Sequence, residues 1–367
     1  MLITENKYRE LERILMTVDT VGGVWNYAIE LIKGMNNHGI DVAVATMGPL
    51  PDSEKRNQLA GFKNVELFES NFKLEWMDEP WNDVEEATEW LLDLEIMTHP
   101  DIVHLNGFVH GALPWHSPVV VVGHSCISSW YENVKGERLP LNRLYYHKRV
   151  CEGLNAADFV IAPSNAMLDM LKNHYGICGR SKVIYNGKNG ECSGNVKQKL
   201  ILSAGRVWDE AKNMMALINI APEIPWPVYI AGDCADRKIY SENVNFLGWV
   251  ASDSLMSWMS RAAIYVSPAK YEPFGLSILE AAINECALIL GDIDSLKEIW
   301  ADAAIFVNPN DYESIKSTIK EMIKNERMRL HYGKKARQRS LNFSSEIMVE
   351  NYIGLYKSLL KKDVEVI

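Results

Sequence analysis

Short apolar runs of the strand type alternate with longer amphipathic segments along the chain, and this alternation restricts the fold more than any other feature. In the first half, DIVHLNG (101–107) and PVVVVGHS (118–125) are almost continuously apolar, which is typical of parallel strands buried on both faces. A helix-type segment, GVWNYAIELIKGMNNHG (23–39), separates RILMTVD (13–19) from DVAVATM (41–47). Such βαβ alternation predicts a parallel, doubly wound sheet.

The alternation starts a second time after a polar segment. The stretch NGKNGECSGNVKQ (186–198) is rich in Gly, Ser and Asn, which is typical of a linker. After it come the strand-type runs LILSAGRV (200–207), AAIYVSPA (262–269) and IFVNP (305–309). We therefore expect two Rossmann-like domains that face a cleft, with ligands at the carboxyl ends of the strands.

Length and composition agree with this organisation. With 367 residues the chain is long enough for two ordinary domains. Apolar residues make up 47% and charged residues 23%, as in soluble globular proteins. The net charge of −10 argues against nucleic acid as a partner, because phosphate backbones attract basic surfaces.

The cysteines and the N-terminal segment bear on cellular location. The six cysteines are scattered without a CxxC pair, which indicates reduced thiols in a cytosolic protein. The segment MLITENKYRELERILM (1–16) lacks the apolar run of a signal peptide. No apolar stretch approaches the roughly 18 residues that a membrane span needs. We expect a cytoplasmic protein.

Several common chemistries lack their motifs. The first strand continues into DTVGGVW (19–25) and not into GxGxxG, so the dinucleotide-binding fingerprint is missing. Neither GxxxxGK[ST] nor HExxH occurs. In GHSCI (123–127), Ile127 replaces the second glycine of the nucleophile elbow, which disfavours a hydrolase with Ser125 as nucleophile.

Two places combine features of an anion site. Gly22 and Gly23 follow the first strand and would let the backbone approach a ligand closely; the alternative is a plain strand-to-helix turn. Arg206 and Lys212 follow the first strand of the second half. Two cations at a strand end suit a pyrophosphate, although solvated surface charge is the alternative for such a pair.

The segment YEPFGLSILEA (271–281) places two glutamates around a helix start. Pro and Gly break the chain after Glu272, and we expect a helix from about Gly275 that contains Glu280. The first N–H groups of that helix have no intrahelical partner and attract anions. The sequence therefore predicts an anion site flanked by two carboxylates.

Together these motifs resemble glycosyltransferase family 4, the retaining, nucleotide-sugar-dependent enzymes of GT-B fold, and they are most similar to bacterial exopolysaccharide-type transferases. The similarity covers nearly the whole chain, and it departs from the family pattern at INECALIL (283–290), where Glu285 and Ala287 replace the usual Gly and Pro. The matching segments are GGVW (22–25), His124 after VVVVG, VIYNG (183–187), GRVWDEAKN (205–213), VSPAKYEPFGLSILEA (266–281) and EIWADAAIFVNP (298–309).

The resemblance implies a division of the chain and a role for each candidate residue. It implies an N-terminal acceptor-side domain (1–187), a linker (188–198), a C-terminal nucleotide-sugar-binding domain (199–345) and a C-terminal helix (346–367) that crosses back onto the first domain. The implied roles are Glu272 and His124 at the donor sugar as catalytic residues; Gly22, Gly23, Arg206 and Lys212 at the phosphates; backbone amides of Phe274, Gly275, Leu276 and Ser277 at phosphate and sugar oxygens; Glu280 at the ribose; and Val250 at the base. A lone histidine is also often structural.

The function that the resemblance implies is retaining transfer of a hexose from a nucleotide sugar, with UDP-glucose as the expected donor, to a saccharide or lipid-linked saccharide. No DxD motif follows a strand, so we expect no metal and no cofactor. A GT-B sugar-nucleotide epimerase and a non-catalytic nucleotide-sugar binder are the alternatives.

Two charged segments have two interpretations each. The acidic segment 75–95 contains three tryptophans that could stack on an acceptor sugar, but the helical spacing of Val84, Ala87, Leu91 and Leu94 favours an amphipathic helix. The basic segment 324–339 could make weak peripheral contact with anionic lipid. An ordinary exposed helix is favoured there.

Overall fold

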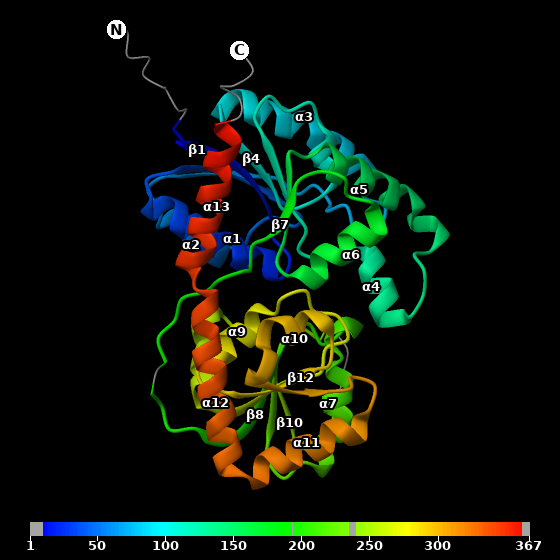
Figure 1. Cartoon of the computed structure of the whole chain (residues 1–367), viewed down its shortest axis with the longest axis vertical. Helices are drawn as coiled ribbons and strands as arrows, with labels where there is room; N and C mark the ends of the chain where they lie inside the picture. The colour runs from blue at the N-terminus through cyan, green and yellow to red at the C-terminus, as the bar shows by residue number, and fades with distance from the viewer. Residues whose placement is uncertain (1–9, 193, 235–239, 362–367) are drawn as a thin grey trace.

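The computed structural model describes residues 10–192, 194–234 and 240–361, which form two α/β domains stacked along the long axis of the molecule (Figure 1). The parts of the predicted domains at 1–9, 193, 235–239 and 362–367 lie outside the described residues. In the first domain seven strands pair in parallel in the order β3-β2-β1-β4-β5-β6-β7. They are β1 (Arg13–Asp19), β2 (Asp41–Met47), β3 (Val65–Glu69), β4 (Ile102–Leu105), β5 (Val119–Val122), β6 (Phe159–Ala162) and β7 (Ser181–Val183).

The second domain repeats this design with six parallel strands among the described residues, in the order β10-β9-β8-β11-β12-β13. The fold class is therefore confirmed as two doubly wound parallel sheets. The strands are β8 (Gln198–Ala204), β9 (Val228–Ala231), β10 (Val244–Gly248), β11 (Ala262–Ser267), β12 (Ala287–Gly291) and β13 (Ala304–Val307).

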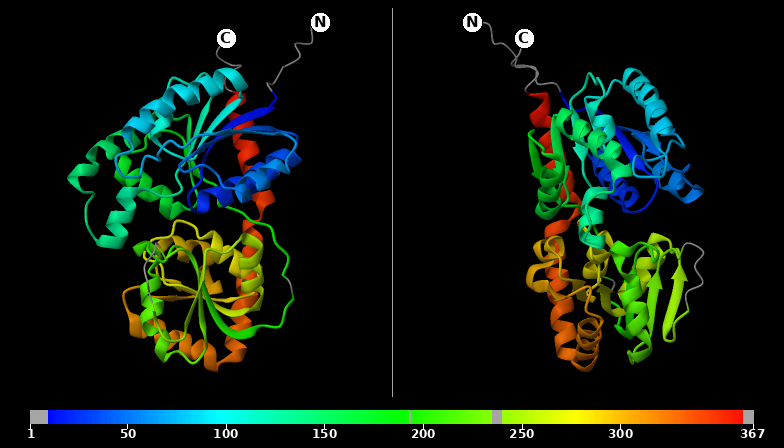
Figure 2. Two further views of the ribbon diagram at one scale, coloured as in Figure 1. Left: turned by 180° about the vertical axis from the view of Figure 1, so that it is seen from behind. Right: turned by 90° about the vertical axis from the view of Figure 1, so that its right-hand side faces the viewer.

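Helices cover both faces of each sheet (Figure 2). Every residue of β4 and β5 is buried, which explains their continuous apolar sequence. The helices of the first domain are α1 (Gly23–Asn37), α2 (Ser53–Ala60), α3 (Trp81–Thr98), α4 (Ile127–Trp130), α5 (Leu144–Ala156) and α6 (Asn165–Tyr175). The helices after β8 in the chain are α7 (Met214–Ile220), α8 (Ser252–Arg261), α9 (Leu276–Ile283), α10 (Asp294–Trp300), α11 (Tyr312–Lys324), α12 (Glu326–Ser340) and α13 (Ser345–Leu360).

The turn after α9 accommodates the departure from the family pattern. Glu285 has a φ of 58°, which is the left-handed region that glycine adopts most easily. The backbone there keeps the geometry of a glycine turn although a glutamate occupies it. A non-glycine residue in this region costs about 1 kcal/mol.

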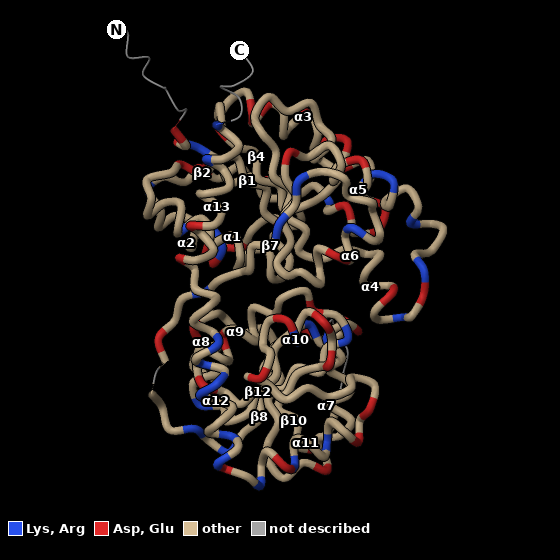
Figure 3. The backbone as a smooth tube through the Cα atoms, in the orientation of Figure 1, with Lys and Arg blue, Asp and Glu red and all other residues tan. Residues whose placement is uncertain are grey.

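The basic segment forms α12, and its Lys and Arg residues are distributed along the helix (Figure 3). Arg339 donates to the Ile299 carbonyl at 2.7 Å, Arg329 donates to the Ile323 carbonyl at 2.6 Å, and Lys335 pairs with Asp302 at 2.6 Å. These contacts engage part of the charge within the second domain and support the interpretation as an ordinary helix. No helix of the described residues is both long and apolar enough to cross a membrane.

Helix α13 returns to the first domain and completes its core. Val349, Tyr352 and Tyr356 are buried in the same apolar cluster as α1 and β1. A β-carbon at Gly34 of α1 would lie 2.1 Å from Val349, so glycine permits the close approach of the two helices. The Tyr356 hydroxyl is hydrogen-bonded to Nδ1 of His104 at 2.6 Å, and burial lowers the pKa of His104 to about 4.

We predict that Tyr356→Phe lowers the free energy of unfolding by about 1–2 kcal/mol, because it leaves a buried imidazole nitrogen without its partner. Thermal denaturation measures the effect. Tyr240→Phe is the control, since the Tyr240 side chain is 88% exposed and its hydroxyl can bond to water in either state. Equal melting temperatures for Tyr356→Phe and the wild type would show that this hydrogen bond does not stabilise the crossing.

Candidate active site

A cleft of about 710 Å³ separates the two domains and is lined by both of them. The carboxyl ends of β1, β4 and β5 meet it from the first domain, and the loops after β8 and β11 meet it from the second. All of the predicted site residues line this cleft. They are Gly22, Gly23, His124, Arg206, Lys212, Val250, Glu272, Phe274, Gly275, Leu276, Ser277 and Glu280.

Two helix N-termini open into the cleft from opposite domains. Gly22 precedes α1 with a φ of 84°, and Gly275 precedes α9 with a φ of 88°. Within the described part of the chain, no side chain caps either helix, so the first N–H groups of each can bind a ligand. A β-carbon at Gly275 would lie 2.7 Å from Ile278, and one at Gly22 would lie 3.5 Å from the Arg206 guanidinium. The glycine loop of the first domain therefore lies against a cation of the second.

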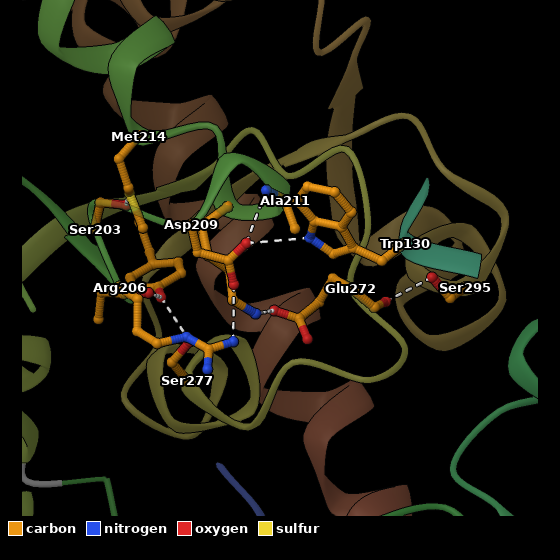
Figure 4. A network of polar contacts seen from close by, with 12 residues as sticks. Trp130, Ser203, Arg206, Asp209, Ala211, Met214, Glu272, Ser277 and Ser295 are labelled. Atoms are coloured by element: carbon orange, nitrogen blue, oxygen red, sulfur yellow. Dashed lines mark hydrogen bonds and ion pairs between the residues drawn. The ribbon is translucent and has the colours of Figure 1, made fainter. Parts of the chain in front are cut away.

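The two predicted phosphate cations are each paired with a carboxylate (Figure 4). Lys212 Nζ lies 2.5 Å from Glu272 Oε2, and Arg206 lies 2.8 Å from Asp209 Oδ2. Ser295 Oγ also donates to the Glu272 carbonyl at 2.7 Å. These bonds hold both cations and the Glu272 loop at the wall of the cleft.

Asp209 is a site residue that the sequence analysis missed. Its Oδ1 accepts hydrogen bonds from the Ala211 amide at 3.0 Å and from the indole of Trp130 at 3.4 Å. Because Trp130 belongs to the first domain, this carboxylate links the two walls of the cleft (Figure 4). Asp209 lies between Arg206 and Lys212 in the GRVWDEAKN segment, and its place between two cations is the signal that could have found it.

Glu280 is buried on α9 with its carboxylate toward the cleft. Its Oε1 forms an ion pair with Lys188, a residue of the connection between the domains. The sequence placed Lys188 at the start of a polar linker and gave no sign of this contact.

His124 is held as a neutral imidazole. Its Nε2 is hydrogen-bonded to Asn106 Oδ1 at 2.8 Å, while the Asn106 amide nitrogen donates to the Thr17 carbonyl at 2.7 Å. This arrangement makes Oδ1 the acceptor, so Nε2 carries the proton and Nδ1 does not. Desolvation lowers the pKa of His124 to about 3. The side chain can therefore accept a hydrogen bond but carries no charge at neutral pH.

Two further carboxylates of the first domain were missed. Desolvation raises the pKa of Asp19 to about 7, although its Oδ1 accepts from the Val21 amide at 2.5 Å and Arg206 lies nearby. Burial also raises the pKa of Glu75, which accepts from the amides of Phe108 and Val109 at 3.0 Å. Asp19 ends β1, so the rule that ligands meet strand ends could have found it.

The acidic segment that contains Glu75 is divided between two environments. Its predicted helix is α3, and Val84, Ala87, Leu91 and Leu94 are all buried, which confirms the amphipathic pattern. Glu75 and Trp76, which precede the helix, line the cleft instead. The tryptophan at position 76 is thus available to a ligand.

Known structures share this two-domain architecture. Sucrose-phosphate synthase from Thermosynechococcus elongatus has a TM-score of 0.80 at 17% identity, over 96% of this chain and all of that one (100%). HepE from Anabaena, solved in complex with UDP and glucose, has a TM-score of 0.71 at 17% identity, over 95% of this chain and 100% of that one. At these identities the likeness shows the fold, which is that of the GT-B glycosyltransferases.

Sequence comparison shows the family. Residues 21–189 match the model of glycosyltransferase family 4, and residues 191–339 match that of the glycosyl transferases group 1. Because the two matches together span both domains, the chain belongs to the family-4-like glycosyltransferases. An uncharacterized 41.2 kDa protein in the cps region of Klebsiella pneumoniae is 27% identical over 199 residues, which are 48% of this chain. The match spans only 55% of that relative.

We predict that Asp19→Asn stabilises the protein in a pH-dependent way. The folded protein keeps Asp19 protonated up to about pH 7, whereas the unfolded chain ionises it around the ordinary value of 3.8. The stability that this proton contributes is lost as the pH rises from 3.8 to about 7. The gain from asparagine should therefore be small near pH 4 and reach at most about 4 kcal/mol above pH 7.

Melting temperatures measured from pH 4 to pH 9 test this, with the exposed Asp93→Asn on α3 as the control. A gain for Asp19→Asn that does not change with pH would contradict the assignment of Asp19 as a buried, late-titrating carboxyl group.

Proposed function

We propose that the chain is a retaining glycosyltransferase that moves a hexose from a nucleotide sugar, with UDP-glucose as the expected donor, to a saccharide or lipid-linked saccharide in polysaccharide biosynthesis. The observation that carries the proposal is the uncapped N-terminus of α9, flanked by Glu272 and Glu280, opposite the uncapped N-terminus of α1. Two neutral amide clusters with cations beside them fit a diphosphate. HepE, which shares the fold, was solved with UDP and glucose, and the Klebsiella relative lies in a cps region.

The first chemical requirement is to stabilise the leaving diphosphate. Breaking the bond from the anomeric carbon to the phosphate oxygen leaves negative charge on the nucleoside diphosphate and positive charge on the sugar. Arg206, Lys212, Gly23 and Leu276 line the cleft, and each of the two cations is held by a carboxylate. Groups of this kind stabilise developing charge without reorganising. We propose that they perform this role without a metal ion.

The second requirement is to hold the reacting sugar. Glu272 is fixed by Lys212 and Ser295, and the neutral His124 presents an unprotonated Nδ1. We assign Glu272 to the sugar hydroxyls and the charge that develops at the anomeric carbon, and His124 to another hydroxyl of the same ring. For retention, the acceptor oxygen attacks from the face that the phosphate leaves. Its proton passes to the departing phosphate oxygen, so charge and atoms balance.

The nucleoside end of the donor fits the remaining wall. A carboxylate can accept one hydrogen bond from each hydroxyl of a vicinal diol, and we assign Glu280 to the ribose on this ground. Val250 lies on the cleft after β10, and the neighbouring Trp249 side chain is 67% exposed there. We assign this stretch to the base.

A panel of UDP-, GDP- and ADP-sugars tests the proposal, with thermal stabilisation and slow donor hydrolysis as readouts. We expect one UDP-hexose to stabilise the protein most and to be hydrolysed slowly, and we expect both effects to persist in the presence of a chelator. Loss of turnover with chelator and its recovery with Mg²⁺ or Mn²⁺ would contradict the metal-free assignment.

The same panel separates the alternative functions. Release of nucleoside diphosphate in proportion to an added saccharide acceptor supports transfer. Conversion of the sugar nucleotide to an isomer without release would identify an epimerase. Stabilisation without any turnover across an acceptor panel would identify a binding protein.

We predict opposite kinetic signatures for the two glutamates of the α9 region. Glu280→Gln weakens a contact that is present in ground and transition states alike, so the donor KM should rise about 30-fold, or about 2 kcal/mol, with little change in kcat. Glu272→Gln removes charge beside the reacting carbon, so kcat should fall about 100-fold while the affinity for UDP stays near that of the wild type.

Steady-state kinetics and UDP calorimetry measure both effects, with Glu321→Gln on the exposed side of α11 as the control. If both substitutions lower the melting temperature and change KM and kcat together, the two side chains only support the loop.

A further inference from the structure

The two connections between the domains lie side by side and are bonded to each other (Figure 1). The Lys188 amide donates to the Phe343 carbonyl at 3.0 Å, and the Ser345 amide donates to Asn189 Oδ1 at 3.0 Å. A β-carbon at Gly187 would lie 2.2 Å from the Ser344 carbonyl oxygen, so only glycine allows this approach. The outgoing chain and the returning chain thus form one compact hinge.

Lys188 extends from this hinge to Glu280, which lines the cleft. Its ammonium group pairs with Glu280 Oε1, and the two side chains are only 13% and 7% exposed. Among the described residues, Oε2 of Glu280 has no hydrogen bond to another side chain or amide. The carboxylate therefore has one oxygen fixed by the hinge lysine and one oxygen left for a ligand.

The same connection contributes a polar group to the cleft. Asn186 lines the cleft and is only 6% exposed, and its Oδ1 has no hydrogen-bond partner among the described residues. Buried polar atoms are almost always bonded in folded proteins. An unpartnered acceptor at the cleft wall indicates that the hinge segment contacts what the cleft binds.

A buried ion pair controls the orientation of its members more than it stabilises the fold. Removal of one partner leaves the other charge buried without compensation. With Lys188 present, the ion pair holds the Glu280 side chain in one direction. Without Lys188, the carboxylate would lose this partner and could turn away from the cleft, and it would become a poorer acceptor for hydroxyl groups.

We propose that Lys188, a residue of the connection between the domains, is a positioning residue that holds the Glu280 carboxylate for the ribose hydroxyls. The inference rests on the proposed function, since it requires that a nucleoside diphosphate occupies the cleft. Lys188 itself contacts Glu280 and does not line the cleft.

Calorimetry with UDP and with 2′-deoxy-UDP tests this role; if the donor panel selects GDP or ADP, that nucleotide and its 2′-deoxy form replace them. The wild type should bind the ribose form about tenfold more tightly, because a missing hydroxyl leaves the carboxylate unsatisfied. Lys188→Met should weaken the ribose form about tenfold and leave the deoxy form almost unchanged, so the preference disappears. Lys188→Arg should restore most of it.

Lys316→Met is the matched control. Lys316 is 12% exposed at its side chain and pairs with Glu223 and Glu313, at a place on α11 that does not line the cleft. Its loss should leave both nucleotide affinities unchanged, even if it lowers the melting temperature. Where Lys188→Met fails to fold, Lys188→Gln keeps a hydrogen-bond donor without the charge, and a reduced preference for the ribose form is expected for it as well.

The outcomes separate this inference from the proposed function. If the wild type binds none of UDP, GDP and ADP, the proposed function is overturned and this inference with it. A wild type that prefers the ribose form, together with a Lys188→Met or Lys188→Gln variant that keeps the full preference, overturns this inference alone. In that case Lys188 only stabilises the hinge.

Discussion

Parallel pairing of all the strands in both sheets is the constraint on which the rest of this structure depends. Parallel neighbours require a crossover between them, so helices cover both faces and the carboxyl ends of the strands meet at one edge. When two such sheets face each other, the loops at these edges converge on one cleft. Asp19 ends one strand of the first sheet, Asn106 and His124 follow two others, and Arg206 follows the first strand of the second. They come together because of strand direction alone.

Charge compensation is the second organising principle. The candidate site is built from buried or half-buried ions, and each has an opposite charge beside it: Lys212 with Glu272, Arg206 with Asp209, and Lys188 with Glu280. Unpaired charges at these depths would be costly. The pairs allow cations and carboxylates to be present in the cleft before a ligand binds, and they fix the geometry in which a ligand meets them. Asp19 and Glu75 differ, because burial raises the pKa of each carboxyl group.

Much of the fold could be predicted from the sequence because its signals are local. Continuous apolar runs such as that of β5 and the helical spacing within α3 depend only on which side chains must leave water. The roles of the glycines before α1 and α9 could also be predicted, because a backbone position with positive φ favours glycine. All of the candidate residues named from sequence line the cleft. Their individual roles remain predictions.

The sequence by itself determined that the chain forms two parallel α/β domains. It also identified the candidate ligand-binding segments, which are the one after the first strand of each domain and the one that carries the two glutamates around the start of α9. Only the tertiary structure decided which groups face each other across the cleft. In the sequence, Lys188 has the surroundings of a polar linker. Packing of α13 on the first domain brings the two connections together, and there Lys188 pairs with Glu280. Such a pairing spans 92 residues. It depends on how whole helices pack, and no local pattern of side chains encodes that distance.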